Sequence, residues 1–477
     1  MGYRMRRRFK KLYLFLSIGL VLFTIVSAWY FHRAVPTFLG YAGKYLCSGV
    51  FISGRSPEKI LRDDIAPMIF FNRLLRTRVD TEAQQVTVSL AGVVDRKAVF
   101  RSGCGCTLVI GTTADALRKQ IDAEPVPRRR SALNRAWPDG DSAPVDPLPA
   151  GVNREKLEQV LQAAFIAPSS GSSAATRAVV VVFAGQLIAE RYAPGFNRNM
   201  ALPGWSMSKS VINALIAILV EKGRLNLKNP APVPQWHRRD DPRRAITLDQ
   251  LLRMSSGLKF GEYYMPPSDV TDMLFNSYDF AAAAADKPLE TAPDTKWHYS
   301  SGTTNIIAGI IRRAVDDDYP NMVTFARREL FERLNMHSAV IELDPSGTIV
   351  GSSYTFATAR DWARLGLLYL QDGVWHGERI FPRDWVAYSR TPALEAPQGQ
   401  YGAHFWLNAG SRNNPSDRRW PRLPTDMFLA WGFQGQYLVI IPSKKLVIVR
   451  LGLDLSSKTW DLQDLVAGVL EAIYESP

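Results

Sequence analysis

The chain has 477 residues, too many for one ordinary domain, and its 46% hydrophobic and 22% charged residues are typical of a globular protein. The formal net charge of +13 raises the question of nucleic-acid binding. Six of the positive charges precede residue 12, and Arg128–Arg130 add three more in a proline-rich segment. Because no basic helix with interleaved aromatic residues follows, the sequence argues against nucleic acid as a partner.

The basic N-terminus is followed by Leu12–Phe31, twenty residues without a charged side chain. That length spans a bilayer as a helix, and the basic flank holds the N-terminus in the cytoplasm. Residues 1–33 are therefore predicted to be a basic tail and anchor in a bacterial inner membrane, with the rest of the chain in the periplasm. A cleaved signal peptide is the alternative, because Val26-Ser27-Ala28 resembles a cleavage site. The aromatic residues Trp29–Phe31 favour the anchor.

The three cysteines, Cys47, Cys104 and Cys106, all lie in the first exported segment. An oxidising compartment permits one disulfide and leaves one thiol over. Cys104 and Cys106 flank a single glycine, so a bridge between them would close a very tight ring. We predict that Cys47 pairs with Cys106 or Cys104; three free cysteines in a small apolar core are the alternative. No cysteine–histidine cluster has the spacing of a zinc site, and we expect no metal or cofactor.

Residues 34–120 are predicted to form a small unit that contains strands. Residues 81–101 alternate enough to suggest strands with a turn at Asp95-Arg96, and residues 105–113 read as another strand. Residues 121–150 are rich in proline, charge and small side chains, which predicts a linker or surface segment.

Residues 151–477 are predicted to form a third unit with its strands at both ends. Asn153 caps a helix, and a hairpin follows that turns around Ala184-Gly185-Gln186. A second hairpin turns at Pro442–Lys444, and an amphipathic helix comes last. The prediction is an α+β fold: an antiparallel sheet flanked by its terminal helices, with a helical lobe inserted from residue 206 to about 400.

Ser206 and Lys209 stand at the start of a long apolar run that ends at Lys222-Gly223. The Ser-x-x-Lys pattern occurs three times in the chain; we interpret Ser56–Lys59 as a helix cap and Ser256–Lys259 as a turn. Only the Ser206 copy precedes a helix that is apolar nearly all round and should therefore be buried.

Residues three apart share a helix face, so the Lys209 amine can reach the Ser206 hydroxyl. Burial would lower the lysine pKa, and a neutral lysine can take the serine proton. The alternative is a capped core helix with a snorkelling lysine.

A serine nucleophile also needs a proton donor for the leaving group and hydrogen-bond donors for the oxyanion. Tyr299 precedes an apolar helix, and a tyrosine there can shuttle protons if a nearby cation depresses its pKa. Gly432–Gly435 opens a strand, where glycine lets a ligand approach the backbone. We expect the backbone N–H groups of Ser206 and Gln436 to form an oxyanion hole.

Ser206-x-x-Lys209, then Tyr299-Ser300-Ser301, then the glycine-rich strand start occur in an order that resembles the serine β-lactamase and penicillin-binding-protein superfamily. Over residues 151–477 the closest likeness is to its class C-like branch, which includes esterases and 6-aminohexanoate-dimer hydrolases. The resemblance implies a β-lactamase/transpeptidase-like fold. It also implies Ser206 as the acyl-enzyme nucleophile, Lys209 as its base partner and Tyr299 as the proton shuttle.

Two departures from the lactamases bear on the substrate. Ser301 stands at the third position of their Tyr-x-Asn motif, and Phe433-Gln434-Gly435 stands where they carry Lys-Thr-Gly. The lysine that pairs with the antibiotic carboxylate is thus missing. No Ser-Asp-Asn occurs, which argues against class A. We expect ester or amide hydrolysis of a small-molecule or peptide-like substrate rather than efficient β-lactam hydrolysis.

The substrate-binding residues expected are Ser301, Phe433, Gln434 and Gly435, joined by Tyr263 and Tyr264 on a loop that can overhang the pocket. His298, next to Tyr299, is expected to face elsewhere, because adjacent residues point apart. The rival hypothesis is a non-catalytic sensor or binding module of the same fold. Such a module would deacylate poorly or lose Lys209, so the presence of Ser206, Lys209 and Tyr299 favours an enzyme. The sequence gives no indication of oligomeric state.

Overall fold

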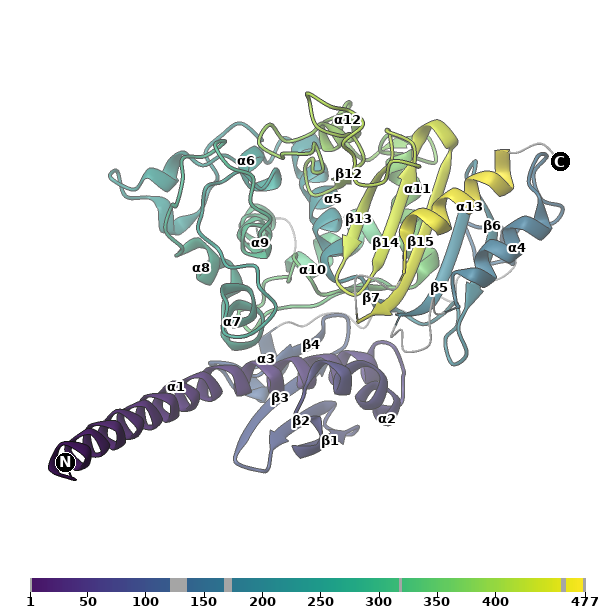
Figure 1. The fold of residues 1–477 in the computed structure, drawn as a ribbon. Coiled ribbons are helices and arrows are strands. Elements are labelled where there is room, and N and C mark those ends of the chain that lie inside the picture. The colour runs from purple at the N-terminus through teal and green to yellow at the C-terminus, as the bar shows by residue number, and fades with distance from the viewer. Residues whose placement is uncertain (1, 121–134, 167–173, 317–319, 456–459, 475–477) are drawn as a thin grey trace.

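The computed structural model describes residues 2–120, 135–166, 174–316, 320–455 and 460–474. A long N-terminal helix leads into a small sheet-containing unit, which packs beneath a larger α+β body (Figure 1). The predicted fold is confirmed: an antiparallel sheet is flanked by its terminal helices and carries a helical lobe between its strands.

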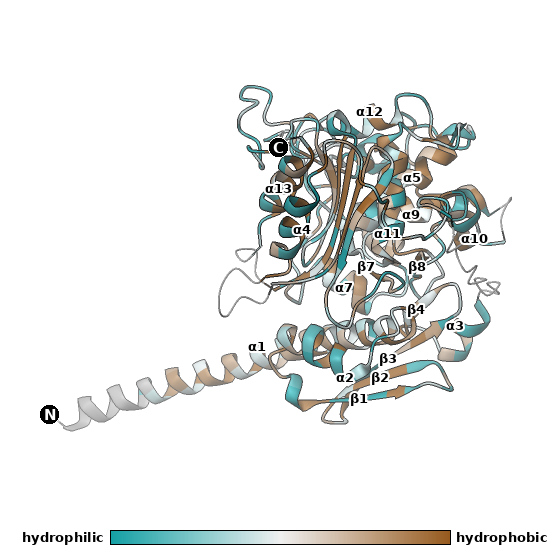
Figure 2. Cartoon of the chain, turned by 90° about the vertical axis from the view of Figure 1, so that its right-hand side faces the viewer, coloured by the Kyte–Doolittle hydropathy of each residue, from teal (hydrophilic) through white to brown (hydrophobic). Residues whose placement is uncertain are grey.

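Helix α1 (Gly2–Phe51) runs without a break through residue 33, where the sequence suggested a boundary. Within the described residues it is the one helix long and apolar enough to span a membrane; its most apolar 18-residue window has a mean hydropathy of 2.1 and contains no buried residue. From Ala34 onward the helix is largely buried. Figure 2 shows the first half projecting beyond the rest of the chain while the second half packs inside it. The expected anchor and the first helix of the small unit therefore form one continuous helix.

The small unit is a four-stranded antiparallel sheet in the order β1-β2-β3-β4, and α1 lies across β2, β3 and β4. Cys47 on α1 forms a disulfide with Cys106 on β4, and Cys104 is free and buried. The elements of the small unit after α1 are α2 (Pro57–Ile60), η1 (Leu61–Ile65), η2 (Ala66–Met68), η3 (Asn72–Leu74), β1 (Leu75–Asp80), β2 (Gln85–Leu90), β3 (Val94–Arg101), β4 (Gly105–Leu108) and α3 (Ala114–Gln120).

The turn predicted at Asp95-Arg96 was wrong. Both residues lie within β3 and pair with Ser89 and Val88 on β2. The chain reverses instead at Ala91–Val93, where Ala91 and Gly92 adopt positive φ angles of 49° and 78°. Glycine takes up that conformation without strain, so the reversal falls at the glycine rather than at the charged pair.

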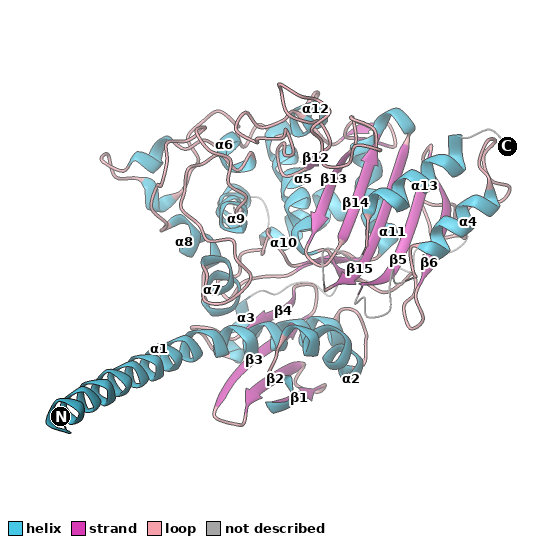
Figure 3. Ribbon diagram, in the orientation of Figure 1, coloured by secondary structure: helices cyan, strands magenta, loops and turns pink. Residues whose placement is uncertain are grey.

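The body is built on a six-stranded antiparallel sheet in the order β12-β13-β14-β15-β5-β6. The last strand therefore pairs with the first, and alternate residues of each strand face opposite sides. Helices α4 and α13 cover one face and α11 covers the other (Figure 3). These elements are α4 (Arg154–Ala163), β5 (Ala174–Phe183), β6 (Gln186–Tyr192), α11 (Ala359–Leu370), β12 (Trp406–Leu407), β13 (Phe428–Gly432), β14 (Gln436–Ile441), β15 (Leu446–Asp454) and α13 (Leu462–Tyr474).

The lobe is inserted between β6 and β12, and α5 is buried between it and the sheet along nearly its whole length. Helix α5 ends at Glu221, Lys222 is its C-cap, and Gly223 follows with φ +66°, at the stop that the sequence predicted. The remaining elements are β7 (Leu202–Pro203), η4 (Trp205–Met207), α5 (Ser208–Glu221), η5 (Pro234–Trp236), η6 (Pro242–Ala245), α6 (Leu248–Leu252), α7 (Asp269–Asn276), α8 (Phe280–Ala285), α9 (Ser301–Val315), α10 (Met322–Ala326), η7 (Arg327–Phe331), β8 (Val340–Ile341), β9 (Thr355–Ala357), β10 (Val374–Trp375), β11 (Glu378–Arg379), α12 (Trp385–Arg390) and η8 (Pro442–Lys444).

Of the predicted linker 121–150, residues 121–134 lie outside the described part of the chain. The rest packs on the body. Trp137 is buried, and the Arg364 guanidinium donates to the carbonyl oxygens of Pro138 and Gly140 at 2.9 and 2.8 Å. The segment is thus held by the body where it is described.

Buried charges join the small unit to the body. Lys44 on α1 forms an ion pair with Glu342, which also accepts hydrogen bonds from the Ser48 hydroxyl at 2.8 Å and the Cys106 N–H at 2.6 Å. Asp64 is paired in the same way with Arg177 on β5. Removing one member of such a pair destabilises the folded protein, because the remaining charge stays buried without its partner.

We predict that Lys44→Met lowers the free energy of unfolding by about 3–5 kcal/mol, because it leaves the Glu342 carboxylate buried and unpaired. The double variant Lys44→Met/Glu342→Gln should recover most of that loss, since neither partner is then charged and the amide oxygen can still accept from the Cys106 N–H. The matched control is Arg33→Gln, which breaks the partly exposed Arg33–Asp272 pair and should change stability by less than about 1 kcal/mol. Denaturant unfolding of the full chain in detergent measures all three. Equal losses in Lys44→Met and Arg33→Gln would contradict the prediction.

Candidate active site

Ser206 lies on a strained turn in front of α5. The preceding residue, Trp205, has a φ of 48°, in the left-handed region that a bulky side chain rarely adopts. Helix α5 begins at Ser208 behind Met207, so Ser206 is not its N-cap. Ser206 is partly exposed, whereas Trp205, Met207 and Ser208 are buried. The turn therefore presents the Ser206 hydroxyl to solvent from an otherwise buried segment, which a simple capped core helix does not explain.

Lys209 is buried directly behind that hydroxyl. Its amine lies 3.1 Å from Ser206 Oγ, 3.2 Å from Ser301 Oγ and 3.1 Å from the carbonyl oxygen of Ser352. Burial lowers the pKa of Lys209 to about 8, and the Glu262 carboxylate acts in the opposite direction. Because the amine is substantially neutral near that pH, it can accept a proton from the Ser206 hydroxyl.

Glu262 is a site residue that sequence reasoning missed. Its carboxylate accepts hydrogen bonds from the Ser301 N–H at 2.8 Å and the Ser301 hydroxyl at 2.5 Å. Ser301 is the first residue of α9, where a helix favours negative charge. The contact joins residues 39 positions apart through a loop, and no local pattern links them. The one available signal was an acidic residue directly before Tyr263 and Tyr264.

Tyr299 lies beside both members of the Ser206–Lys209 pair. The Lys209 amine is 4.7 Å from the centre of its ring, and Tyr401 and Trp406 pack against the ring with centroids 5.9 and 5.4 Å away. Burial and the Glu262 carboxylate raise the pKa of Tyr299, and a side-chain hydrogen bond with Ser206 offsets this in part. The sequence suggested proton shuttling by Tyr299 if a nearby cation depressed this pKa. The cation lies over the ring face instead, and Tyr299 stays protonated as a hydrogen-bond donor.

The glycine-rich segment after β13 comes close to the Ser206 turn. A Cβ on Gly432 would lie 2.1 Å from the carbonyl oxygen of Gly204, so only glycine permits this approach. The Phe433 ring packs edge-on against Trp205, with centroids 5.6 Å apart, and stacks with Tyr264 at 5.2 Å. Phe433 and Tyr264 therefore form an apolar wall beside Trp205.

Gln434, Gly435 and Gln436 form the turn behind that wall. Gln434 is buried with φ 60°, and Gly435, with φ 76°, packs against Arg450 and Asp454. The Gln436 side chain donates to the carbonyl oxygens of Phe433, Gln434 and Gly452 and accepts from the Gly452 N–H. These side chains stabilise the turn. The oxyanion role predicted for the N–H groups of Ser206 and Gln436 stays a prediction.

The two loop tyrosines differ in position. Tyr264 is 38% exposed and donates to Glu262 at 3.3 Å, whereas Tyr263 is 77% exposed. His298 faces away, as expected, with Nε2 2.7 Å from the carbonyl oxygen of Phe260. His404, which the sequence did not single out, is buried behind the lysine with Nδ1 2.9 Å from the Lys209 carbonyl oxygen. Burial and the nearby Lys209 lower the pKa of His404 to about 3, so its imidazole is neutral and holds the helix backbone.

Over the described part of the chain, no group of three or more histidine, cysteine, aspartate or glutamate side chains could hold a metal ion.

The family model described as Beta-lactamase matches residues 162–457. The chain belongs to the beta-lactamase family. That match contains the Ser206 turn, Tyr299 and the glycine-rich segment, and it confirms the superfamily resemblance seen in the sequence. Members of this fold are serine hydrolases of ester and amide bonds, and the predicted enzyme class is confirmed with the family.

Among curated proteins, this beta-lactamase-family chain is 25% identical to a 6-aminohexanoate-dimer hydrolase of Paenarthrobacter ureafaciens, over 71% of this chain and 86% of the relative. A solved structure from Bacillus anthracis, provisionally named a 6-aminohexanoate-dimer hydrolase, matches with a TM-score of 0.51 and 22% identity over 67% of this chain and 80% of that one. The structure of a family VIII carboxylesterase matches with a TM-score of 0.52 and 13% identity, over 67% and 96%. At these identities the structural likenesses establish the fold.

We predict that kcat/KM for an ester substrate rises with pH and levels off above a midpoint of about 8, because Lys209 must lose its proton to act as a base. Below the midpoint the rate should fall about tenfold per pH unit. Glu262→Gln should move the midpoint to lower pH, since its charge raises the pKa of Lys209. The control, Glu82→Gln on the β1–β2 turn, should leave the midpoint in place. A Glu262→Gln midpoint that stays or moves upward would refute this assignment of the base.

Proposed function

We propose that the chain is a membrane-anchored serine hydrolase that cleaves ester or amide bonds through an acyl-Ser206 intermediate. The observation that carries this proposal is the buried Lys209 amine 3.1 Å from the partly exposed Ser206 hydroxyl. With the pKa of Lys209 near 8, about one molecule in ten carries a neutral amine at pH 7. That fraction is sufficient for a general base, because protonation equilibrates rapidly compared with turnover.

In the first step the Lys209 amine takes the Ser206 proton while Oγ forms a bond to the substrate carbonyl carbon. The carbonyl oxygen becomes an oxyanion, which we assign to the N–H groups of Ser206 and Gln436. The protonated Tyr299 then donates to the departing alcohol or amine and recovers a proton from Lys209. Water attacks the acyl-enzyme by the same route in reverse, which releases the acid and restores the Ser206 hydroxyl.

Phe433 and Tyr264 suit a neutral or apolar acyl group next to the nucleophile. A carboxylate-bearing group would find a phenylalanine where the lactamases carry a lysine. We therefore propose small esters and amides as substrates, bonds of the kinds that the names of the curated relative and the carboxylesterase indicate for those proteins. A carboxylate such as that of the 6-aminohexanoate dimer would have to lie away from Phe433. Ser301, hydrogen-bonded to Glu262, offers polar groups beside the Lys209 amine.

The proposed topology places residues 1–33 as cytoplasmic tail and anchor, with the small unit, the linker and the hydrolase body on the periplasmic side. It rests on the basic residues before residue 12 and the apolar, exposed first half of α1. The disulfide between Cys47 and Cys106 agrees with an oxidising compartment.

We predict that a fluorophosphonate probe labels the full chain in detergent and that Ser206→Ala abolishes both labelling and hydrolysis of a p-nitrophenyl ester. Lys209→Ala should also lose labelling, and Tyr299→Phe should lower turnover by about 10²–10⁴-fold. Ser56→Ala is the matched control, because Ser56 begins another Ser-x-x-Lys but is exposed and caps α2. Full activity in Ser206→Ala would overturn the proposal. Labelling without turnover would support the rival sensor.

A further inference from the structure

Trp205, the residue before the nucleophile, is enclosed by aromatic rings from three separate segments. Tyr41 and Tyr45 stack on it with centroids 6.4 and 5.9 Å away, Tyr354 packs at 6.4 Å and Phe433 at 5.6 Å. Tyr41 and Tyr45 belong to α1 and lie far outside residues 162–457, the part matched by the family model. A segment beyond the family fold thus forms one wall of the nucleophile turn.

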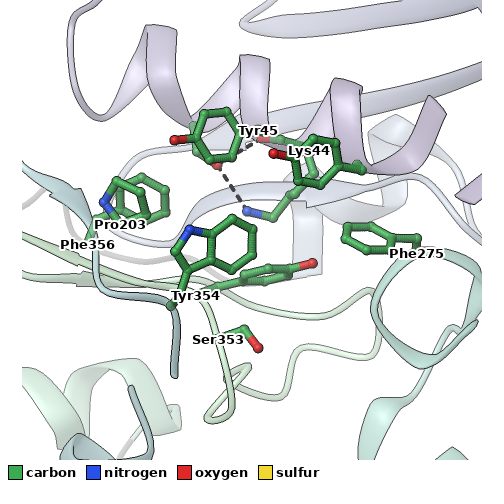
Figure 4. A pocket seen from close by; sticks show the side chains of 10 residues that line it. Lys44, Tyr45, Pro203, Phe275, Ser353, Tyr354 and Phe356 are labelled. Carbon is green, nitrogen blue, oxygen red and sulfur yellow. Dashed lines mark hydrogen bonds between the residues drawn. The ribbon is translucent and has the colours of Figure 1, made fainter. Parts of the chain in front are cut away.

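Helix α1 is tightly fixed at this contact. Tyr45 donates to Asp64 at 2.9 Å, the Lys44 amine lies 4.1 Å above the Tyr354 ring, and the disulfide ties Cys47 to the sheet. Figure 4 shows Lys44 and Tyr45 reaching down from the helix toward Tyr354. The cavity enclosed between helix and body is about 10 Å³, roughly the space for one water. Because so little free volume separates the helix from the body, a displacement of α1 would also displace Trp205.

The same cavity also reaches the segment that holds Lys209. Ser353 lines it, and the carbonyl oxygen of the adjacent Ser352 accepts the hydrogen bond from Lys209. Both the nucleophile turn and the segment that orients the base therefore lie against α1.

A non-glycine residue held at positive φ persists only where its surroundings enforce that conformation. We infer that Tyr41 and Tyr45 are positioning residues: by packing on Trp205 they hold its left-handed backbone and so keep Ser206 Oγ at the Lys209 amine. This inference rests on the proposed function and gives residues 34–120 a role in it, because the disulfide-linked unit sets the position of α1.

The test compares Tyr41→Leu and Tyr45→Leu with two controls in the full chain. Tyr45→Phe keeps the ring but loses the bond to Asp64, and Phe51→Leu removes a ring that stacks on Phe100, farther along α1 from Trp205. We expect both tyrosine-to-leucine variants to lower kcat and the fluorophosphonate labelling rate at least tenfold. KM should stay within twofold and the pH midpoint should be unchanged, and both controls should match the wild type.

A folded Tyr41→Leu or Tyr45→Leu with wild-type kcat would overturn the inference, as would an equal loss in Phe51→Leu. If Tyr45→Leu does not fold, Tyr41→Leu decides alone, since the Tyr41 hydroxyl bonds the neutral Gln434 side chain and not a buried charge such as Asp64. Failure of the proposed function itself gives a different result, because Ser206→Ala would then stay active.

A second, independent observation concerns the end of the small unit nearest the projecting half of α1. Phe70 packs edge-on against Phe38 at 6.2 Å yet is 74% exposed. Leu74 and Val93 are 59% and 86% exposed, and the Ala91 N–H donates to the Leu74 carbonyl oxygen at 3.3 Å, which brings their segments together. We call this group the membrane-facing tip; its members are Phe70, Arg73, Leu74, Arg76 and Val93.

The tip lies where the anchor enters the body. Phe38 is seven residues beyond Phe31, about 10 Å along a helix. The polar layer of a bilayer extends about 5–7 Å beyond the hydrocarbon on each side, so a tip that packs on Phe38 lies at the outer boundary of that layer. Figures 1 and 2 both show the start of β1 and the β2–β3 turn on the side from which α1 arrives. Exposed aromatic and aliphatic side chains beside arginines suit the boundary between acyl chains and anionic headgroups.

We propose that the tip rests in the outer headgroup layer beside the anchor and thereby fixes the orientation of the body above the bilayer. This proposal rests on the membrane anchoring proposed above. In this proposal the small unit contacts the membrane at one end. At the other end it holds α1 against the turn that carries Ser206.

The test places spin labels on the full chain in vesicles of phosphatidylethanolamine and phosphatidylglycerol. Val93→Cys and Leu74→Cys report on the tip, Glu82→Cys on the opposite end of the same sheet, and Leu20→Cys on the anchor. We expect the two tip labels to be more accessible to oxygen than to a water-soluble nickel complex, and the Glu82 label to show the reverse. If the Leu20 label is buried in lipid but the tip labels are as accessible to the nickel complex as the Glu82 label, the proposal for the tip is refuted and the anchor stands. If the Leu20 label is itself exposed to water, both the anchor and the tip proposal are refuted.

Discussion

The hydrogen bond between the buried Lys209 amine and the Ser206 hydroxyl is the contact on which the rest of the site depends. Burial under α9 and the lobe lowers the pKa of the lysine and makes it a base. The left-handed turn at Trp205 aims the serine at it. Without both features, Ser206 would be an ordinary weak nucleophile at the start of a core helix.

Much of the fold followed from periodicity and turn chemistry. The hairpins at Gly185 and Pro442 and the terminal helices were predicted because their patterns are local. The turn predicted at Asp95-Arg96 was wrong because Gly92, three positions before Asp95, meets the backbone requirement better. The continuity of α1 across residue 33 was also missed, since a change from exposed to buried apolar surface leaves no mark in the sequence.

The site was predictable only where its members share a helix turn. Ser206 and Lys209 are three residues apart, so their contact follows from helix geometry. The bond from Glu262 to Ser301 and the packing of Tyr45 on Trp205 join loops and helices distant in the chain. No spacing rule anticipates such contacts, and the raised pKa of Tyr299 depends on the buried surroundings that they create.

In the proposed mechanism Ser206 is the covalent centre, and the elements from helix α1 to the C-terminal sheet hold it in place. The most direct test of this mechanism is mass spectrometry of the full chain quenched with acid during turnover of a slowly hydrolysed p-nitrophenyl ester. We predict an acyl group on the peptide that contains Ser206, lost with time as substrate is exhausted. Turnover with the acyl group on another residue, or with no adduct at any quench time down to the dead time, would contradict the account.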